Sequence, residues 1–216
     1  MRAFTLDKYN TWYDWRLTLT AKEVTPPEPK TNYISLDGAH GSLDLTEALT
    51  GEIPFDDRTV SASFWTSEGT FAERVELLRT ISTALHGRRV QIIEPDDPEH
   101  FFLGRIVLKS VEQSQVHLAF DMEATCEPWR YALEETTRAV AVSGSSAGVV
   151  LYNGGVKVLS PDVTVTGTVT LTFDGASATL EEGSYRVTGL RLQPGNNLVT
   201  VSGSGSAAFT FREAML

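Results

Sequence analysis

Cysteine is nearly absent from this 216-residue sequence, which has Cys126 alone, and no apolar run approaches the roughly 20 residues that a membrane-spanning helix needs. A single cysteine excludes an intrachain disulfide and redox catalysis by a cysteine pair, which fits assembly in a reducing compartment. Charges interrupt the N-terminus every few residues, so we expect a soluble protein with no export signal and no membrane partner. Basic residues are few as well, with 18 Lys and Arg against 28 Asp and Glu. The net charge of −10 would repel phosphates, so we expect no specific nucleic-acid binding.

Sequence motifs for catalysis, nucleotide binding and metal binding are absent too. There is no GxGxxG that opens a helix and no GxxxxGK[ST], and no two of the four histidines stand at metal-ligand spacing. The densest ionisable segment, residues 94–100, contains two prolines between predicted strands, so we interpret it as a rigid, solvated hairpin tip. Cys126 has no neighbouring residue that would activate its thiol. We therefore expect no enzyme, no catalytic residue, no cofactor and no metal.

The composition of the chain changes near residue 138. All four Trp, all four His and 23 of the 28 acidic residues precede this point, whereas residues 139–216 hold 11 of the 17 Gly. The later segment has only four basic and five acidic side chains. The sequence therefore predicts two domains, residues 1–138 and 139–216.

One segment of the first domain has the pattern of a helix. Thr70 and Glu73 have the spacing of a capping box, and apolar residues then recur every three or four positions from Phe71 to Leu85. Gly87 can adopt the left-handed conformation that ends a helix, which predicts a helix over about residues 70–86. The surrounding segments are β-branched or alternating: 17–21, 31–36, 59–65, 90–93, 101–111 and 116–126. One helix that packs on a mostly antiparallel sheet is the expected arrangement.

The second domain has the pattern of an antiparallel β-sandwich. Short β-branched segments recur about every 8 to 12 residues with Gly or Pro between them, which predicts seven or eight strands. Those segments are 149–152, 156–159, 163–166, 169–173, 185–187, 197–201 and 208–211. We interpret the Gly/Ser stretches 143–148 and 202–206 as loops.

Three groups of residues in the first domain are candidates for contact with another chain. Trp12 and Trp15 stand just before a strand, where at least one ring could reach a neighbour. Pro26, Pro27 and Pro29 separate two predicted strands and predict a projecting loop or arm. Asp96 and Asp97 lie in the acidic segment 94–100, which is the alternative position for such an arm.

Several segments match a known family in order and spacing. They are NTWYDWRL (10–17), PPEPKTNY (26–33), DGAHGSLDLTEALTG (37–51), RTVSASF (58–64), LHG (85–87), DDP (96–98) followed by GR (104–105), and CEPW (126–129). Together they resemble the distal tail protein (Dit) family of long-tailed, non-contractile phages, particularly those of Gram-positive hosts and their prophages. The second domain, which ends in FTFREAML (209–216), is similar to the C-terminal β-sandwich of many such proteins.

The resemblance implies a mainly β fold: an N-terminal β-sandwich with one helix and an arm or hairpin, followed by a C-terminal antiparallel β-sandwich. It implies a virion protein, assembled in the host cytoplasm, of which six copies close into a hub at the distal end of the tail. The implied partners are other copies in a homo-hexamer, the tail tube protein, the tail-associated lysin or tip protein, and a receptor-binding protein. Ring closure needs two different complementary patches on each copy, and an arm can supply one of them.

Two other functions are considered. A carbohydrate-binding β-sandwich at the tail tip would use an aromatic platform for host attachment, but the second domain has no Trp. Its aromatic residues are Tyr152, Phe173, Tyr185, Phe209 and Phe211, and strand alternation would bury most of them. A tail-tip hydrolase would need a carboxylate or Cys/His site, for which the sequence gives no pattern.

Overall fold

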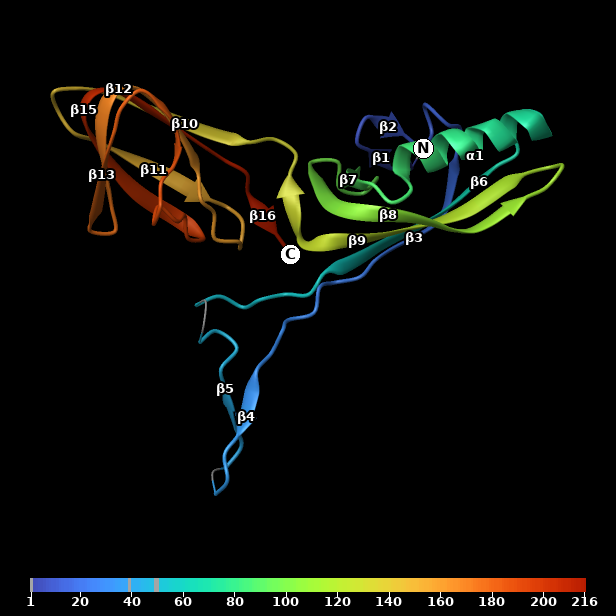
Figure 1. The fold of residues 1–216 in the computed structure, drawn as a ribbon, viewed down its shortest axis with the longest axis horizontal. Helices are drawn as coiled ribbons and strands as arrows, with labels where there is room; N and C mark the ends of the chain where they lie inside the picture. Colours follow the sequence, from blue (N-terminus) through green and yellow to red (C-terminus); the bar gives the residue numbers. More distant parts are fainter. Residues whose placement is uncertain (1, 39, 49–50) are drawn as a thin grey trace. The chain divides into compact units, whose positions relative to one another are not determined.

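The structure, a computed structural model, describes residues 2–38, 40–48 and 51–216. The chain forms two compact units: the first comprises the residues up to Arg130 together with Leu216, and the second runs from Tyr131 to Met215 (Figure 1). The boundary predicted at residue 138 falls inside strand β10 (Thr136–Ser143), which belongs wholly to the second unit. The change in composition therefore follows the start of the second unit by a few residues.

The first unit is built on one curled antiparallel sheet. Its strands run in the spatial order β2-β1-β7-β8-β9-β6-β3. They are β1 (Thr5–Leu6), β2 (Tyr9–Asn10), β3 (Thr18–Val24), β6 (Arg58–Thr66), β7 (Arg89–Ile93), β8 (His100–Gln113) and β9 (Leu118–Ala132). Alternate residues of β6, including Val60, Ala62 and Phe64, are buried, because successive side chains of a strand point to opposite faces. The predicted N-terminal sandwich is thus formed by a single sheet that curls around its own core.

Helix α1 (Phe71–Leu85) packs on this core, as predicted. Thr70 and Glu73 form the capping box at its start, and Gly87 adopts a φ of +76° just beyond its end. Ile81 and Leu85 are buried, but Phe71, the first residue of the predicted apolar stripe, is 39% exposed. In the described residues, no helix is both long and apolar enough to cross a membrane.

A long arm connects β3 to β6, as the prolines predicted (Figure 1). We use "the arm" for residues 25–57; it contains the short hairpin β4 (Tyr33–Ser35) and β5 (Ser42–Asp44). Its two sides are joined by backbone hydrogen bonds, from the Lys30 N–H to the Pro54 carbonyl at 2.8 Å and from the Asp56 N–H to the Glu28 carbonyl at 2.8 Å. Ala39, Leu49 and Thr50, which fall within the matching segment 37–51, lie outside the described residues.

The second unit is a sandwich made from one bent sheet. Two long strands, β12 (Asp162–Phe173) and β15 (Gly195–Phe211), pair with each other along most of their length. In one layer, the first half of β12 pairs with β14 (Gly183–Arg186) and the last half of β15 pairs with β10. In the other layer, the last half of β12 pairs with β13 (Ala176–Leu180) and the first half of β15 pairs with β11 (Ala147–Asn153). Apolar residues of both layers share one core, so the predicted antiparallel sandwich is confirmed. A further short strand, β16 (Ala214–Met215), follows β15.

Glycines mark the bend, and here two sequence expectations are wrong. Residues 202–206 lie inside β15 and are not a loop, because Gly203 and Gly205 let the strand cross Gly167 of β12 with both backbones in close approach. The segment 156–159 forms no strand; its one ladder contact is the isolated bridge from Leu159 to Leu192. Each of the long strands β12 and β15 contains two segments that the sequence predicted as separate strands.

Candidate functional site

The arm exposes apolar side chains without a core of its own. Every residue of β4 and β5 is exposed. The large apolar side chains in the arm that remain open to solvent are Tyr33, Ile34, Leu36, Leu43 and Ile53, with exposed fractions between 41% and 59%. A two-stranded hairpin of this kind is at best marginally stable alone in water, so a surface that covers these side chains would stabilise it.

Beyond Lys30, the charged residues of the arm are all acidic. Between residues 31 and 57 the sequence has six Asp and Glu and no Lys or Arg. Asp44, at the end of β5, accepts hydrogen bonds from the Thr46 hydroxyl at 2.5 Å and from the Thr46 N–H at 2.9 Å, and these bonds lower the pKa of its carboxyl. Asp44 therefore stays ionised at neutral pH, and the arm presents negative charge next to its apolar side chains.

The prolines of the arm lie at its root. Pro29 forms an isolated antiparallel bridge with Phe55 on the returning side, and the Phe55 ring meets Trp129 edge-to-face with centroids 5.8 Å apart. Pro26 and Pro29 are exposed, while Pro27 is half-buried. The prolines therefore lie where the arm leaves the sheet, and the exposed apolar side chains Tyr33, Ile34, Leu36 and Leu43 lie farther along the arm.

The aromatic segment near the N-terminus divides between the core and the surface. Trp15 is 6% exposed and stacks on Tyr9 with ring centroids 5.0 Å apart, so it belongs to the core of its own unit. Trp12 is half-buried, and the Arg16 guanidinium lies 5.7 Å from its ring centroid. Tyr13, between the two, is 75% exposed. The sequence indicated neither this division nor Tyr13, because residues 11–15 form a turn rather than a periodic element.

The acidic segment 94–100 is held within its own unit and is not an arm. The Lys22 ammonium contacts Glu94 and lies 2.7 Å from Asp96, while Asp97 lies 2.7 Å from both Arg130 and the His100 ring. Partial burial acts to raise the pKa of Asp97, but the hydrogen bonds from His100 and Arg130 outweigh it and lower that pKa. Asp96 and Asp97 thus neutralise cations of the same chain, which leaves residues 25–57 as the projecting segment.

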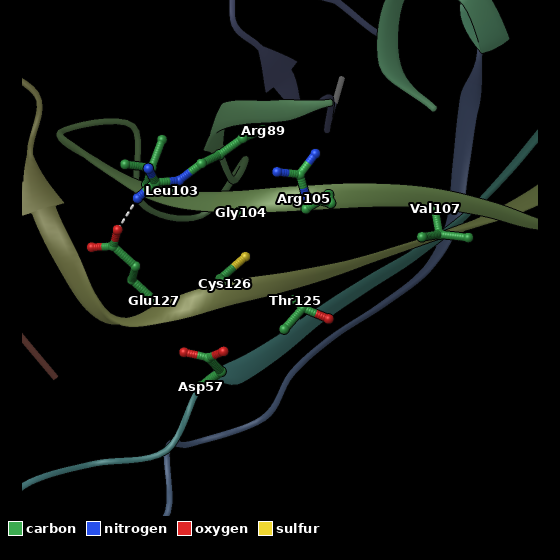
Figure 2. A pocket seen from close by; sticks show the side chains of 9 residues that line it. All are labelled: Asp57, Arg89, Leu103, Gly104, Arg105, Val107, Thr125, Cys126 and Glu127. Carbon is green, nitrogen blue, oxygen red and sulfur yellow. Dashed lines mark hydrogen bonds and ion pairs between the residues drawn. The ribbon is translucent and has the colours of Figure 1, made fainter. Parts of the chain in front are cut away.

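A shallow pocket of about 350 Å³ lies on the sheet face of the first unit (Figure 2). Arg89 forms an ion pair with Glu127 there, and Leu103 and Val107 supply apolar lining. Burial raises the pKa of the Cys126 thiol to about 12, so the sulfur is protonated and is not a nucleophile at neutral pH. Gly104 is required beside it, because a Cβ there would collide with the sulfur. In the part of the chain that the structure describes, no group of three or more His, Cys, Asp and Glu could hold a metal ion.

The second unit offers one exposed aromatic ring. Tyr152 is 57% exposed, whereas Phe173, Phe209 and Phe211 are buried, as strand alternation predicted, and Tyr185 packs against the core. In residues 131–215, all of which are described, a platform of several exposed rings is not formed.

No protein-family model and no curated protein sequence matches the chain. Among solved structures, the Dit protein of phage SPP1 matches with a TM-score of 0.71 and 15% sequence identity over 100% of both chains. That structure is described as a paradigm of the hub adsorption apparatus in phages that infect Gram-positive bacteria. The chain therefore has, over its full length, the fold of a phage Dit protein, the family that its sequence segments resemble.

Proposed function

We propose that this chain is a structural virion protein, a distal tail hub that links the tail tube to the tail-tip or receptor-binding apparatus of a long-tailed phage or prophage. The observation that carries the proposal is the full-length likeness to the SPP1 Dit protein, which includes both units of the chain. A hub acts by holding its partners, so it needs no catalytic site and no cofactor. In this role the chain is located at the distal end of the virion tail.

The arm supports assembly from several copies. A closed ring needs two different surfaces on each subunit, and a projecting acidic, apolar arm is one such surface. Complete burial of a large apolar side chain contributes about 1.5–3 kcal/mol, so covering five half-exposed ones would contribute roughly 1 kcal/mol each. That gain offsets part of the cost of association, to which other contacts of the ring would add. We propose a ring of six copies, with the interface residues on the arm and at Trp12 and Tyr13.

The remaining partners follow from this role. The tail tube protein and the tail-associated lysin or tip protein would contact the two faces of the ring, and the second unit would contact a receptor-binding protein. Carbohydrate binding by the second unit has less support, because Tyr152 alone of its aromatic rings is well exposed. A sandwich that only connects proteins needs no aromatic platform.

Native mass spectrometry and negative-stain electron microscopy of the purified full-length chain test the proposal. The expected result is a closed annulus with six copies. In one variant, residues 31–53 are replaced by Asn-Gly, which joins the hydrogen-bonded neighbours Lys30 and Pro54 by a two-residue turn. It is expected to keep the sheet, because β3 and β6 pair directly with each other, but to lose the annulus. A wild-type chain that stays monomeric at high concentration, alone and with tail proteins, would refute a ring-forming hub. Saturable binding to cell-wall glycans would instead favour the attachment module.

A further inference from the structure

A groove of about 390 Å³ lies along the solvent side of helix α1, beside β2. We call it the helix groove; it is lined by Tyr9, Glu76, Arg79, Thr80, Thr83, Ala84 and Arg88. The Lys8 ammonium lies 5.2 Å from the Tyr9 ring centroid and adds a cation beside it. Arg79 pairs with Glu76 at 2.7 Å, so that Arg88 is the guanidinium of the lining whose charge no carboxylate of the lining offsets. The groove therefore carries net positive charge around an aromatic ring and a methyl group.

The arm has the complementary chemistry. Asp44 and Glu47 are exposed and acidic, and Ile34 and Leu43 face each other across the hairpin with exposed fractions of 41% and 51%. Opposite charges steer two surfaces together, and apolar side chains then gain by leaving water. The sheet-face pocket is a poorer match, because Asp57 and Glu127 offset Arg89 and Arg105 there.

An arm cannot fill the groove of its own chain. Figure 1 shows β4 and β5 at the end of an arm that extends away from α1, with the strands of the sheet between them. Both elements belong to the first unit. The groove and the arm are two different patches on remote sides of one unit, which is the arrangement that head-to-tail association needs.

We propose that the helix groove is the receptor for the arm of a second copy of this chain, with Arg88 and Arg79 facing the acidic side chains of the incoming hairpin and Tyr9 facing its apolar ones. This inference rests on the proposed ring-forming function and names the surface that accepts the arm. The contact repeats from copy to copy, so each subunit gives one arm and receives another.

Charge reversal tests the electrostatic part. Arg88→Glu is expected to raise the protein concentration needed for half-assembly at least about tenfold, because it places a carboxylate opposite an acidic arm. The matched control is Lys109→Glu, which makes the same charge change at an exposed residue that pairs with Glu123, outside the groove. Adding Glu47→Lys to the Arg88 variant is expected to recover part of the loss. Half-assembly concentrations are measured by native mass spectrometry, with circular dichroism to show that each variant is folded.

Crosslinking tests the contact itself. A photo-crosslinking benzoylphenylalanine replaces Leu43, and equal amounts of ¹⁴N-labelled and ¹⁵N-labelled chains are mixed before irradiation. The expected product joins the arm of one isotope to a tryptic peptide of the other that lines the groove, either 9–16, which contains Tyr9, or 80–88. An intact annulus in the Arg88 variant, at the concentration that the Lys109 control needs, or crosslinks to other peptides, would overturn the groove assignment and leave the ring proposal standing. A wild-type chain that never associates would overturn both.

Discussion

Replacing Gly167 by alanine tests the bend that makes one sheet into two layers. Gly167 has a φ of +80°, and a Cβ there would lie 2.5 Å from the Ser204 carbonyl oxygen and 3.1 Å from the Gly205 Cα. Alanine in this backbone conformation costs about 1 kcal/mol, and displacing the neighbouring strand costs about 1–3 kcal/mol more. The expected destabilisation of the second unit is therefore about 2–4 kcal/mol.

Gly175 is the matched control for this substitution. Its φ is +77°, but no atom lies within 4 Å of the position of a Cβ, so Gly175→Ala is expected to cost only the backbone contribution of about 1 kcal/mol. Hydrogen exchange of β12 and β15 peptides in increasing urea measures the stability of the second unit. All four Trp precede residue 131, so their fluorescence transition reports the first unit and should not move.

Equal destabilisation by the two alanines would refute the close crossing of β12 and β15. It would mean that the conformation of each glycine, and not the contact between strands, sets the cost. A shift of the Trp transition in the Gly167 variant alone would also contradict the expectation that the first unit folds on its own core.

Three further predictions concern the first unit. Arg74→Met removes a buried guanidinium that donates to the Gly69 and Gln115 carbonyls, so it should lower the free energy of unfolding by about 2–4 kcal/mol in urea titrations. The exposed control Arg79→Ala should change that free energy by less than about 0.5 kcal/mol. The folded-state pKa of Asp97 is depressed, so its stabilising contribution is present above the unfolded pKa of about 3.9 and is lost as the pH falls through the folded pKa. Asp97→Asn should therefore flatten the acid limb of a plot of stability against pH. An unchanged limb would contradict the contacts of Asp97 with His100 and Arg130. With its pKa raised to about 12, Cys126 should resist iodoacetamide at pH 8 until urea unfolds the chain, and rapid labelling of the native protein would show that the sulfur is accessible.

The elements with local signals could be predicted from the sequence. The capping box of Thr70 and Glu73 and the left-handed Gly87 act within a few residues, so the bounds of α1 follow from local chemistry. The prolines likewise indicated the arm, because proline cannot donate to a sheet ladder. Arg74 was missed, since its four carbonyl acceptors come from residues 67–69 and 115, and contact between such segments leaves no periodic pattern.

The second unit shows where local reasoning fails. Glycine usually interrupts a strand, so Gly167, Gly203 and Gly205 were interpreted as breaks, although here they permit two strands to cross. The intrachain contacts of three interface candidates could not be predicted from the sequence either. Trp15 stacks on Tyr9 across a turn that has no periodic pattern, and Asp96 and Asp97 pair with Lys22 and Arg130, which are distant along the chain.

The arm joins two strands that are already hydrogen-bonded neighbours, since β3 pairs with β6 from Val24 and Val60 onward. A turn of a few residues could make the same connection, so the sheet does not depend on the length or composition of the inserted segment. Evolution can therefore change the arm without refolding the unit that carries it. In the proposed ring, such freedom would let related proteins diverge in which subunits recognise one another, and it would keep mixed rings rare where two of them are made in one cell.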